Sequence, residues 1–240
     1  MFEWFRKRRR AADVLRITPR DEASELAGVR VDLSDLTPDK VAYLGQVAYF
    51  ELAVFESLTR AVQTAPQLAA KEGLSEAAGE ALHKHQALIA ELRKLKVDPA
   101  EAMQPFAAQM DQFEKLTLGQ DWYETMLGVY LTAGFLDDFF ARLCDGLPSG
   151  MRDRVAAVLE PDKYSDVIVE NLRAAMAEDP RLASRLALWG RRLMGDTQLV
   201  ARSAVRASDS YDAQNELIDP VFTDLISAHS RRMDGLGLTA

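Results

Sequence analysis

The residues of this sequence with the clearest capacity for chemistry are carboxylates on apolar helix faces. Apolar residues recur at intervals of three and four between residues 44 and 62, and Glu51 falls in the middle of that series. A buried carboxylate must be paired, hydrogen-bonded, protonated or bound to a metal ion. Glu51 is therefore either a buried functional group or a residue at the solvated margin of a slightly rotated helix.

Two other carboxylates meet the same criterion. Glu124 is the only charged residue between Trp122 and Leu136, so it is either buried with its helix or solvated in the first turn, where it complements the helix dipole. Asp196 continues a second apolar series with three-and-four spacing, formed by Leu182, Leu186, Trp189 and Leu193.

A Glu-x-x-His pair occurs at Glu80 and His83, which share one face of a helix. Such pairs, with a carboxylate from each neighbouring helix, hold two iron ions in four-helix bundles. A helical wheel, however, turns Glu80 and His83 away from the apolar stripe and brings Lys84 and His85 nearer to it. A solvated face is thus the alternative to metal binding.

A complete di-iron site also needs a second histidine three residues after a carboxylate. The remaining histidine, His229, follows Ile226 at that spacing, so the sequence predicts an incomplete site. Motifs of serine hydrolases, P-loop proteins and dinucleotide-binding proteins are absent from the sequence.

Helices must position these side chains, because the apolar residues recur with helical spacing and no segment shows the alternation of a strand. Thr37 is the expected N-cap of the first helix, with Pro38 as its first residue. Four helices longer than 18 residues with short connections predict an all-α four-helix bundle with additional short helices. The expected helices cover residues 37–62, 75–96, 99–115, 118–144, 149–159, 162–177, 180–207 and 212–232.

Three parts of the chain follow from this pattern. Residues 1–35 are expected to form a flexible basic arm and an irregular lead-in, residues 36–207 the bundle, and residues 208–240 a C-terminal helix that packs on it. The helix over 118–144 is expected at the centre of the core, since apolar residues cover every face of it. Gly128 and Gly134 would let neighbouring helices approach it closely.

Composition is that of an ordinary globular protein, with 240 residues, 48% hydrophobic and 28% charged. The single cysteine, Cys144, forms no internal disulfide and is expected to be a small buried hydrophobe. No apolar stretch is long enough for a membrane span, and the basic start does not lead into a secretory signal. The predicted location is cytoplasmic.

Charge is unevenly distributed along the chain, whose net charge is −8. Residues 1–20 carry +5, which leaves −13 for residues 21–240. Such a body repels a nucleic-acid backbone unless its basic groups gather on one face. The arm mixes aromatic and basic residues, so it is expected either to contact an anionic membrane surface or nucleic acid, or to be a solvated tail.

Four segments carry a resemblance to a known family: residues 97–106, 121–124, 137–139 and 179–196. They resemble actinobacterial ferritin-like proteins related to the tRNA isopentenyladenosine hydroxylase (MiaE-like). The resemblance implies a ferritin-like bundle and, in active hydroxylases, a di-iron centre that activates oxygen. Glu51 and Glu124 match family carboxylates, whereas Lys84 and Tyr164 stand near positions where histidines are expected, and Asp196 stands where a glutamate is usual.

Two functions follow from these observations. The preferred one is a ferritin-like bundle with an incomplete di-iron site and no cofactor, acting as a non-catalytic or interaction protein on an unknown protein partner or on a second copy. The alternative is a non-haem di-iron oxidoreductase, hydroxylase-like and acting on tRNA. Its iron ligands would be Glu51, Glu80, His83 and Glu124, with His85 and Asp196 as further candidates.

Overall fold

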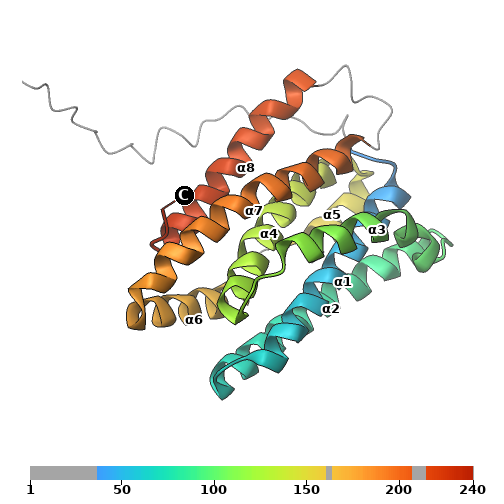
Figure 1. The fold of residues 1–240 in the computed structure, drawn as a ribbon. Coiled ribbons are helices and arrows are strands. Elements are labelled where there is room, and N and C mark those ends of the chain that lie inside the picture. The colour runs from blue at the N-terminus through green and yellow to red at the C-terminus, as the bar shows by residue number, and fades with distance from the viewer. Residues whose placement is uncertain (1–36, 161–163, 207–214, 240) are drawn as a thin grey trace, which may run out of the picture. The chain divides into compact units, whose positions relative to one another are not determined.

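The computed structural model describes residues 37–160, 164–206 and 215–239, and these residues form helices and no strand (Figure 1). The predicted all-α fold is therefore confirmed. The elements are α1 (Lys40–Thr64), α2 (Leu68–Lys94), α3 (Pro99–Thr117), α4 (Trp122–Leu143), the short 3₁₀ helix η3 (Cys144–Gly146), α5 (Ser149–Val158), α6 (Tyr164–Glu178), α7 (Pro180–Arg206) and α8 (Asn215–Gly235).

Aspartates cap several of these helices. Asp39 is the N-cap of α1 and accepts from the backbone N–H groups of Val41 and Ala42, so the predicted N-cap at Thr37 is wrong. Thr37 instead donates to the carbonyl of Leu143 at 2.6 Å, which ties the entry of α1 to the end of α4. Asp98 and Asp121 cap α3 and α4 in the same way as Asp39.

Helix α2 begins seven residues before the predicted start at Ser75. Its first two turns bury only Ala70 and Leu74, and Leu68 is 82% exposed. This part of the helix therefore shows no apolar stripe from which its start could be located.

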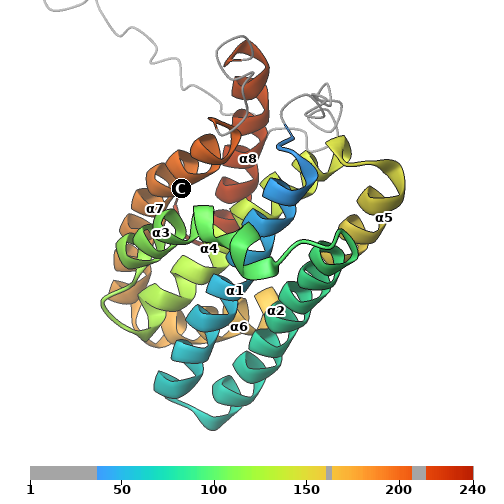
Figure 2. The same cartoon turned by 90° about the vertical axis from the view of Figure 1, so that its right-hand side faces the viewer.

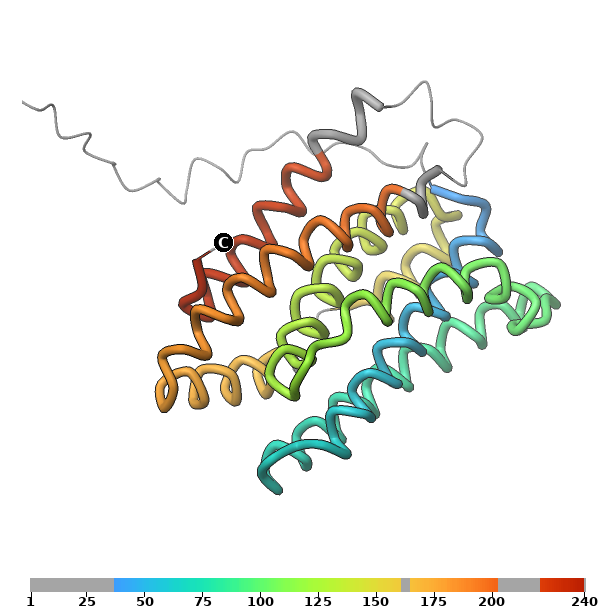
Figure 3. The backbone as a smooth tube through the Cα atoms, in the orientation of Figure 1, coloured from blue at the N-terminus to red at the C-terminus, as the bar shows by residue number. Residues whose placement is uncertain are grey.

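Helix α4 lies at the centre and packs against α1, α6, α7 and α8 (Figure 2). Ala141 is the single exposed residue of α4 and the others are buried or half-buried, which confirms the prediction of a central helix. Helices α1 and α2 form an antiparallel hairpin, and the chain then passes through α3, which packs on α1, before it enters α4 (Figure 3).

Aromatic side chains from distant parts of the chain fill the core. Tyr43 of α1 donates its hydroxyl to the carbonyl of Phe140 at 2.7 Å. Phe222 of α8 packs between Phe135 and Phe139, with ring centroids 6.4 and 6.0 Å away. Cys144 is free and buried, as predicted.

The two glycines of α4 have different neighbours. A Cβ on Gly128 would lie 3.1 Å from the backbone carbonyl of Thr117, so this glycine does allow the end of α3 to approach closely. A Cβ on Gly134 would instead lie 2.5 Å from the Arg232 guanidinium. Gly134 therefore makes room for a charged side chain rather than for a helix backbone.

Helix α8 packs on α4 and α7. The predicted arm over 1–35 lies outside the described residues, as do the chain positions at which the predicted domain divisions fall. None of the described helices combines the length and the apolar character that crossing a bilayer requires.

Candidate functional site

A polar cluster lies between α1 and α2 in the middle of the bundle. Glu51 is 2% exposed, and its Oε1 lies 3.9 Å from Nζ of Lys84, which is 5% exposed. An ammonium and a carboxylate this close attract each other strongly where water is excluded. A buried ion pair therefore occupies the position at which the sequence singled out a lone carboxylate.

His85 belongs to the same cluster. Its Nδ1 lies 2.7 Å from the carbonyl oxygen of Ala48 and is buried with it. Because a carbonyl can only accept, Nδ1 carries a proton and donates it to Ala48. Both Lys84 and His85 face the core, as the helical wheel predicts.

The second buried carboxylate, Glu124, is held at the start of α4. Its Oε1 accepts from Nη1 of Arg185 at 2.7 Å, and its Oε2 accepts from the backbone N–H of Gln120 at 2.9 Å. Arg185 also donates through Nη2 to Asp121, and this bond, together with Glu124, raises the pKa of the guanidinium. Both carboxylate oxygens of Glu124 are therefore already hydrogen-bonded.

Glu51 and Glu124 lie at different levels of the bundle. The indole N–H of Trp122 donates to the carbonyl of Ala61 at 3.0 Å, so the start of α4 lies beside the last turns of α1. Ala61 follows Glu51 by ten residues, which is about 15 Å along the helix axis. The two carboxylates therefore do not converge on one point.

The remaining candidates lie on the surface or at its margin. Glu80 and His83 are both exposed, as the helical wheel also predicts. Asp196 is only half-buried, because Leu193 and Thr197 occupy the buried positions of this turn of α7. Within residues 37–160, 164–206 and 215–239, no three His, Cys, Asp or Glu side chains gather closely enough to hold a metal ion.

A third buried carboxylate, Glu91, was missed by sequence reasoning. Arg154 of α5 binds it in a bidentate manner, from Nε to Oε1 at 3.0 Å and from Nη2 to Oε2 at 2.8 Å. Lys94 adds a bond at 2.6 Å. The Arg154 bonds lower the pKa of Glu91 to about 2. The spacing of three residues between Glu91 and Lys94 could have been recognised in the sequence, but the bond from Arg154 of α5 could not.

The buried histidine of α8, His229, is held neutral. Burial, and to a smaller extent the charge of Arg232, lower its pKa to about 4, while a hydrogen bond with the backbone of Gly190 acts in the opposite direction. This environment could not be predicted from the sequence, because the contact comes from α7.

Comparison with known proteins agrees with this architecture. The family model described as "Ferritin-like domain, actinomycetes" matches residues 38–220, which is most of the chain. No protein with a curated description matches the sequence. A bundle in which α4 packs against α1, α6 and α7, together with a match of this extent, assigns the chain to the ferritin-like domain family of actinomycetes.

Proposed function

We propose that this protein is a ferritin-like bundle that works without a di-iron centre and acts by binding another protein. The observation that carries the first half of the proposal is Lys84, whose ammonium lies 3.9 Å from the Glu51 carboxylate in the core. A protonated lysine donates hydrogen bonds and cannot ligate a metal ion. Its positive charge also opposes the binding of Fe(II) beside it.

The other candidate ligands support the same proposal. Glu124 has both oxygens engaged by Arg185 and Gln120, and it lies at a different level from Glu51. Glu80 and His83 face outwards. This donor set does not fit a di-iron centre, so we derive no oxygen chemistry from it.

The metal-free reading is tested by measuring iron in protein purified without chelators, by inductively coupled plasma mass spectrometry. We expect no stoichiometric iron, and no rise in the midpoint of thermal unfolding on anaerobic addition of Fe(II). Glu51→Gln is the matched control, because it removes the most deeply buried candidate ligand. About two iron ions per chain, with a stabilisation by Fe(II) that Glu51→Gln abolishes, would overturn the proposal.

The outward side of α7 supports a role in protein binding. We use the name α7 outer face for its exposed residues between 181 and 199, none of which is acidic. Leu188 and Leu199 are 65% and 69% exposed, and they lie three turns apart on one side of the helix. The face consists of Arg181, Ser184, Arg185, Leu188, Arg191, Arg192, Gly195 and Leu199.

This mixture of arginines and leucines fits an acidic protein with apolar side chains at its contact surface. Arg185 is already paired with Asp121 and Glu124, so Arg181, Arg191 and Arg192 supply the positive charge that attracts a negatively charged partner locally. Nucleic acid would satisfy the arginines but would leave both leucines without apolar contacts. The leucines therefore favour a protein partner.

A photo-crosslinking amino acid at position 188 or 199 tests this surface in cells that make the protein, with position 68 on α2, where the leucine is even more exposed, as the control. We expect an adduct with one acidic protein, lost when the other leucine of the face is changed to Glu, because the new carboxylate repels an acidic partner. An adduct that forms equally from position 68, or one with nucleic acid or a second copy of the chain, would refute the proposal that the α7 outer face binds an acidic protein.

The relation to the tRNA isopentenyladenosine hydroxylase stays a prediction from the sequence. In this proposal the chain shares the ferritin-like bundle with that enzyme and not its oxygen chemistry. The iron measurement also decides this alternative, since a di-iron oxidoreductase requires the metal.

A further inference from the structure

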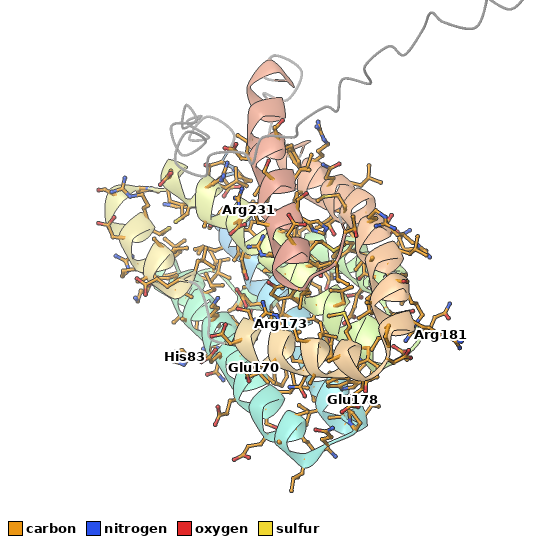
Figure 4. All side chains as sticks on the ribbon, turned by 90° about the vertical axis from the view of Figure 1, so that its left-hand side faces the viewer. His83, Glu170, Arg173, Glu178, Arg181 and Arg231 are labelled. Atoms are coloured by element: carbon orange, nitrogen blue, oxygen red, sulfur yellow. The ribbon has the colours of Figure 1, made fainter. Side chains whose placement is uncertain are left out.

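Two adjoining cavities lie beneath α3, on a different face of α1 from Glu51. Helix α3 packs on α1 and α7, and it crosses in front of α1 and α4 in Figure 2. Figure 4 views the opposite side of the molecule, where Glu170 and Arg173 of α6 point to solvent. Each cavity has a volume of about 40 Å³. Since one water molecule needs roughly 10–15 Å³, each has room for about three non-hydrogen atoms.

The first cavity is mostly apolar, and the second is more polar and lies towards the start of α4. Apolar side chains of α1, α3 and α4 form most of the first cavity: Phe50, Ala53, Val54, Met110, Phe113, Val129 and Ala133. Water finds few hydrogen-bond partners in such a space, so an apolar group occupies it more favourably. Both cavities are lined by Ser57, Glu114, Thr117, Val129 and Thr132. They therefore form the apolar and the polar end of one site.

Every hydroxyl group among the described lining residues already donates its proton. Ser57 donates to Oε1 of Glu114 at 2.7 Å. Thr117, Thr125 and Thr132 each donate to the backbone carbonyl four residues earlier, at 2.9, 2.9 and 2.8 Å. A hydroxyl oxygen that donates its proton can still accept a hydrogen bond. The polar end of the site therefore offers acceptors and no free hydroxyl donor.

The charge at the polar end is balanced. Glu114 is the one charged side chain among the described lining residues, and Arg60 donates both to its Oε1 and, at 3.2 Å, to Ser57. Arg60 is exposed and Glu114 is half-buried, so this ion pair lies where the site meets solvent. An anion would find no hydroxyl donor there, and a cation would compete with Arg60 for the carboxylate. The lining therefore favours a neutral ligand that donates a hydrogen bond.

We propose that the two cavities together bind a small aliphatic alcohol of about four carbon atoms, whose length follows from the space for about six non-hydrogen atoms. The alkyl chain contacts Val54, Phe113 and Val129, and the hydroxyl donates to Oγ1 of Thr132, where the two cavities meet. Of the hydroxyl-bearing residues that line both cavities, Thr132 is the buried one, so water competes least for its oxygen. This inference does not depend on the function proposed above.

Titration of the full chain with 1-butanol, followed by the methyl NMR signals of its methionines, tests the proposal. Met110 lines the first cavity, whereas Met176 of α6 and Met194 of α7 line neither cavity and serve as internal controls. We expect a saturable shift of the Met110 signal, without one for the two controls, and a Kd of about 1 mM. The isomer methyl propyl ether has the same atoms but no proton to donate, so it should bind at least about tenfold more weakly.

Variants then assign the binding to the site. Thr132→Val keeps the shape of the side chain but removes the acceptor, so it should weaken 1-butanol to the affinity of the ether. Thr197→Val in α7 is the matched control, because Thr197 is also buried and also donates to the carbonyl four residues earlier. Ala53→Leu extends a half-buried side chain into the first cavity and should abolish binding of both probes. Absence of a saturable Met110 shift, equal binding of the two probes, or equal 1-butanol binding by Thr132→Val and Thr197→Val would overturn the inference.

Discussion

Glu51 and Glu124 are both buried carboxylates, but the protein satisfies them in different ways. Glu124 lies in the first turn of α4, where a backbone N–H, a guanidinium and the helix dipole all favour its charge. Glu51 lies in the middle of α1, where the backbone is already hydrogen-bonded, and the structure places a lysine of α2 beside it. A carboxylate at a helix end is satisfied locally, whereas one in mid-helix depends on another helix.

The largest effect should come from breaking the mid-helix pair. We expect Glu51→Gln to lower the free energy of unfolding by roughly 3–5 kcal/mol, because it removes a negative charge that offsets the buried Lys84. The double variant Glu51→Gln, Lys84→Met should recover most of the loss. Urea denaturation measures both, and a double variant as unstable as the single one would show that the charges are not coupled.

A substitution at a buried apolar position in the central helix provides a reference for the effect of Glu51→Gln. Leu131 of α4 is fully buried, so Leu131→Ala should cost roughly 2–5 kcal/mol through lost contacts and a cavity. Denaturant unfolding at several protein concentrations gives the value. A cost below about 1 kcal/mol would contradict the central position of α4, and a midpoint that depends on concentration would indicate a dimer.

A smaller effect is expected at the helix end. Glu124→Gln keeps one acceptor for Gln120 but loses the charge-assisted bond to Arg185, which is half-exposed and can be solvated instead. We expect a loss of about 1–2 kcal/mol in the free energy of unfolding. A loss as large as that for Glu51→Gln would mean that a carboxylate at a helix end depends on its charged partner as much as one in mid-helix does.

A pH dependence is expected at Glu91. Its pKa is lowered from 4.5 to about 2, so its contribution to stability is complete above about pH 4.5 and is lost as the pH falls towards 2. In that window the free energy of unfolding of the wild type should fall more steeply than that of Glu91→Gln. Parallel pH profiles for the two proteins would show that the Arg154 bond adds no stability.

Sequence reasoning located the helices and the faces of their side chains, because periodicity is a local property. It placed Lys84 and His85 nearer to the core than Glu80 and His83, and the structure agrees. It could not foresee that Lys84 lies beside Glu51, since that contact depends on the register of α2 against α1.

Contacts between segments that are distant in the sequence could not be predicted either. The bond from Arg154 to Glu91 spans 63 residues, and the two cavities beneath α3 gather residues from Phe50 to Ala133. Helix starts also proved hard to place where the first turn is solvated, as at α2. A single sequence contains no information on which of many possible helix pairs form, beyond the rule that short loops join neighbours.

The position of Phe222 between Phe135 and Phe139 has a consequence for how the protein is made. The α1–α2 hairpin can assemble on the ribosome as soon as residue 94 has emerged, because its partners are close in sequence. The aromatic core of α4 stays open until α8 is synthesised, more than 80 residues later. During that interval the nascent chain exposes its most apolar helix, and exposed apolar surface of this kind promotes aggregation.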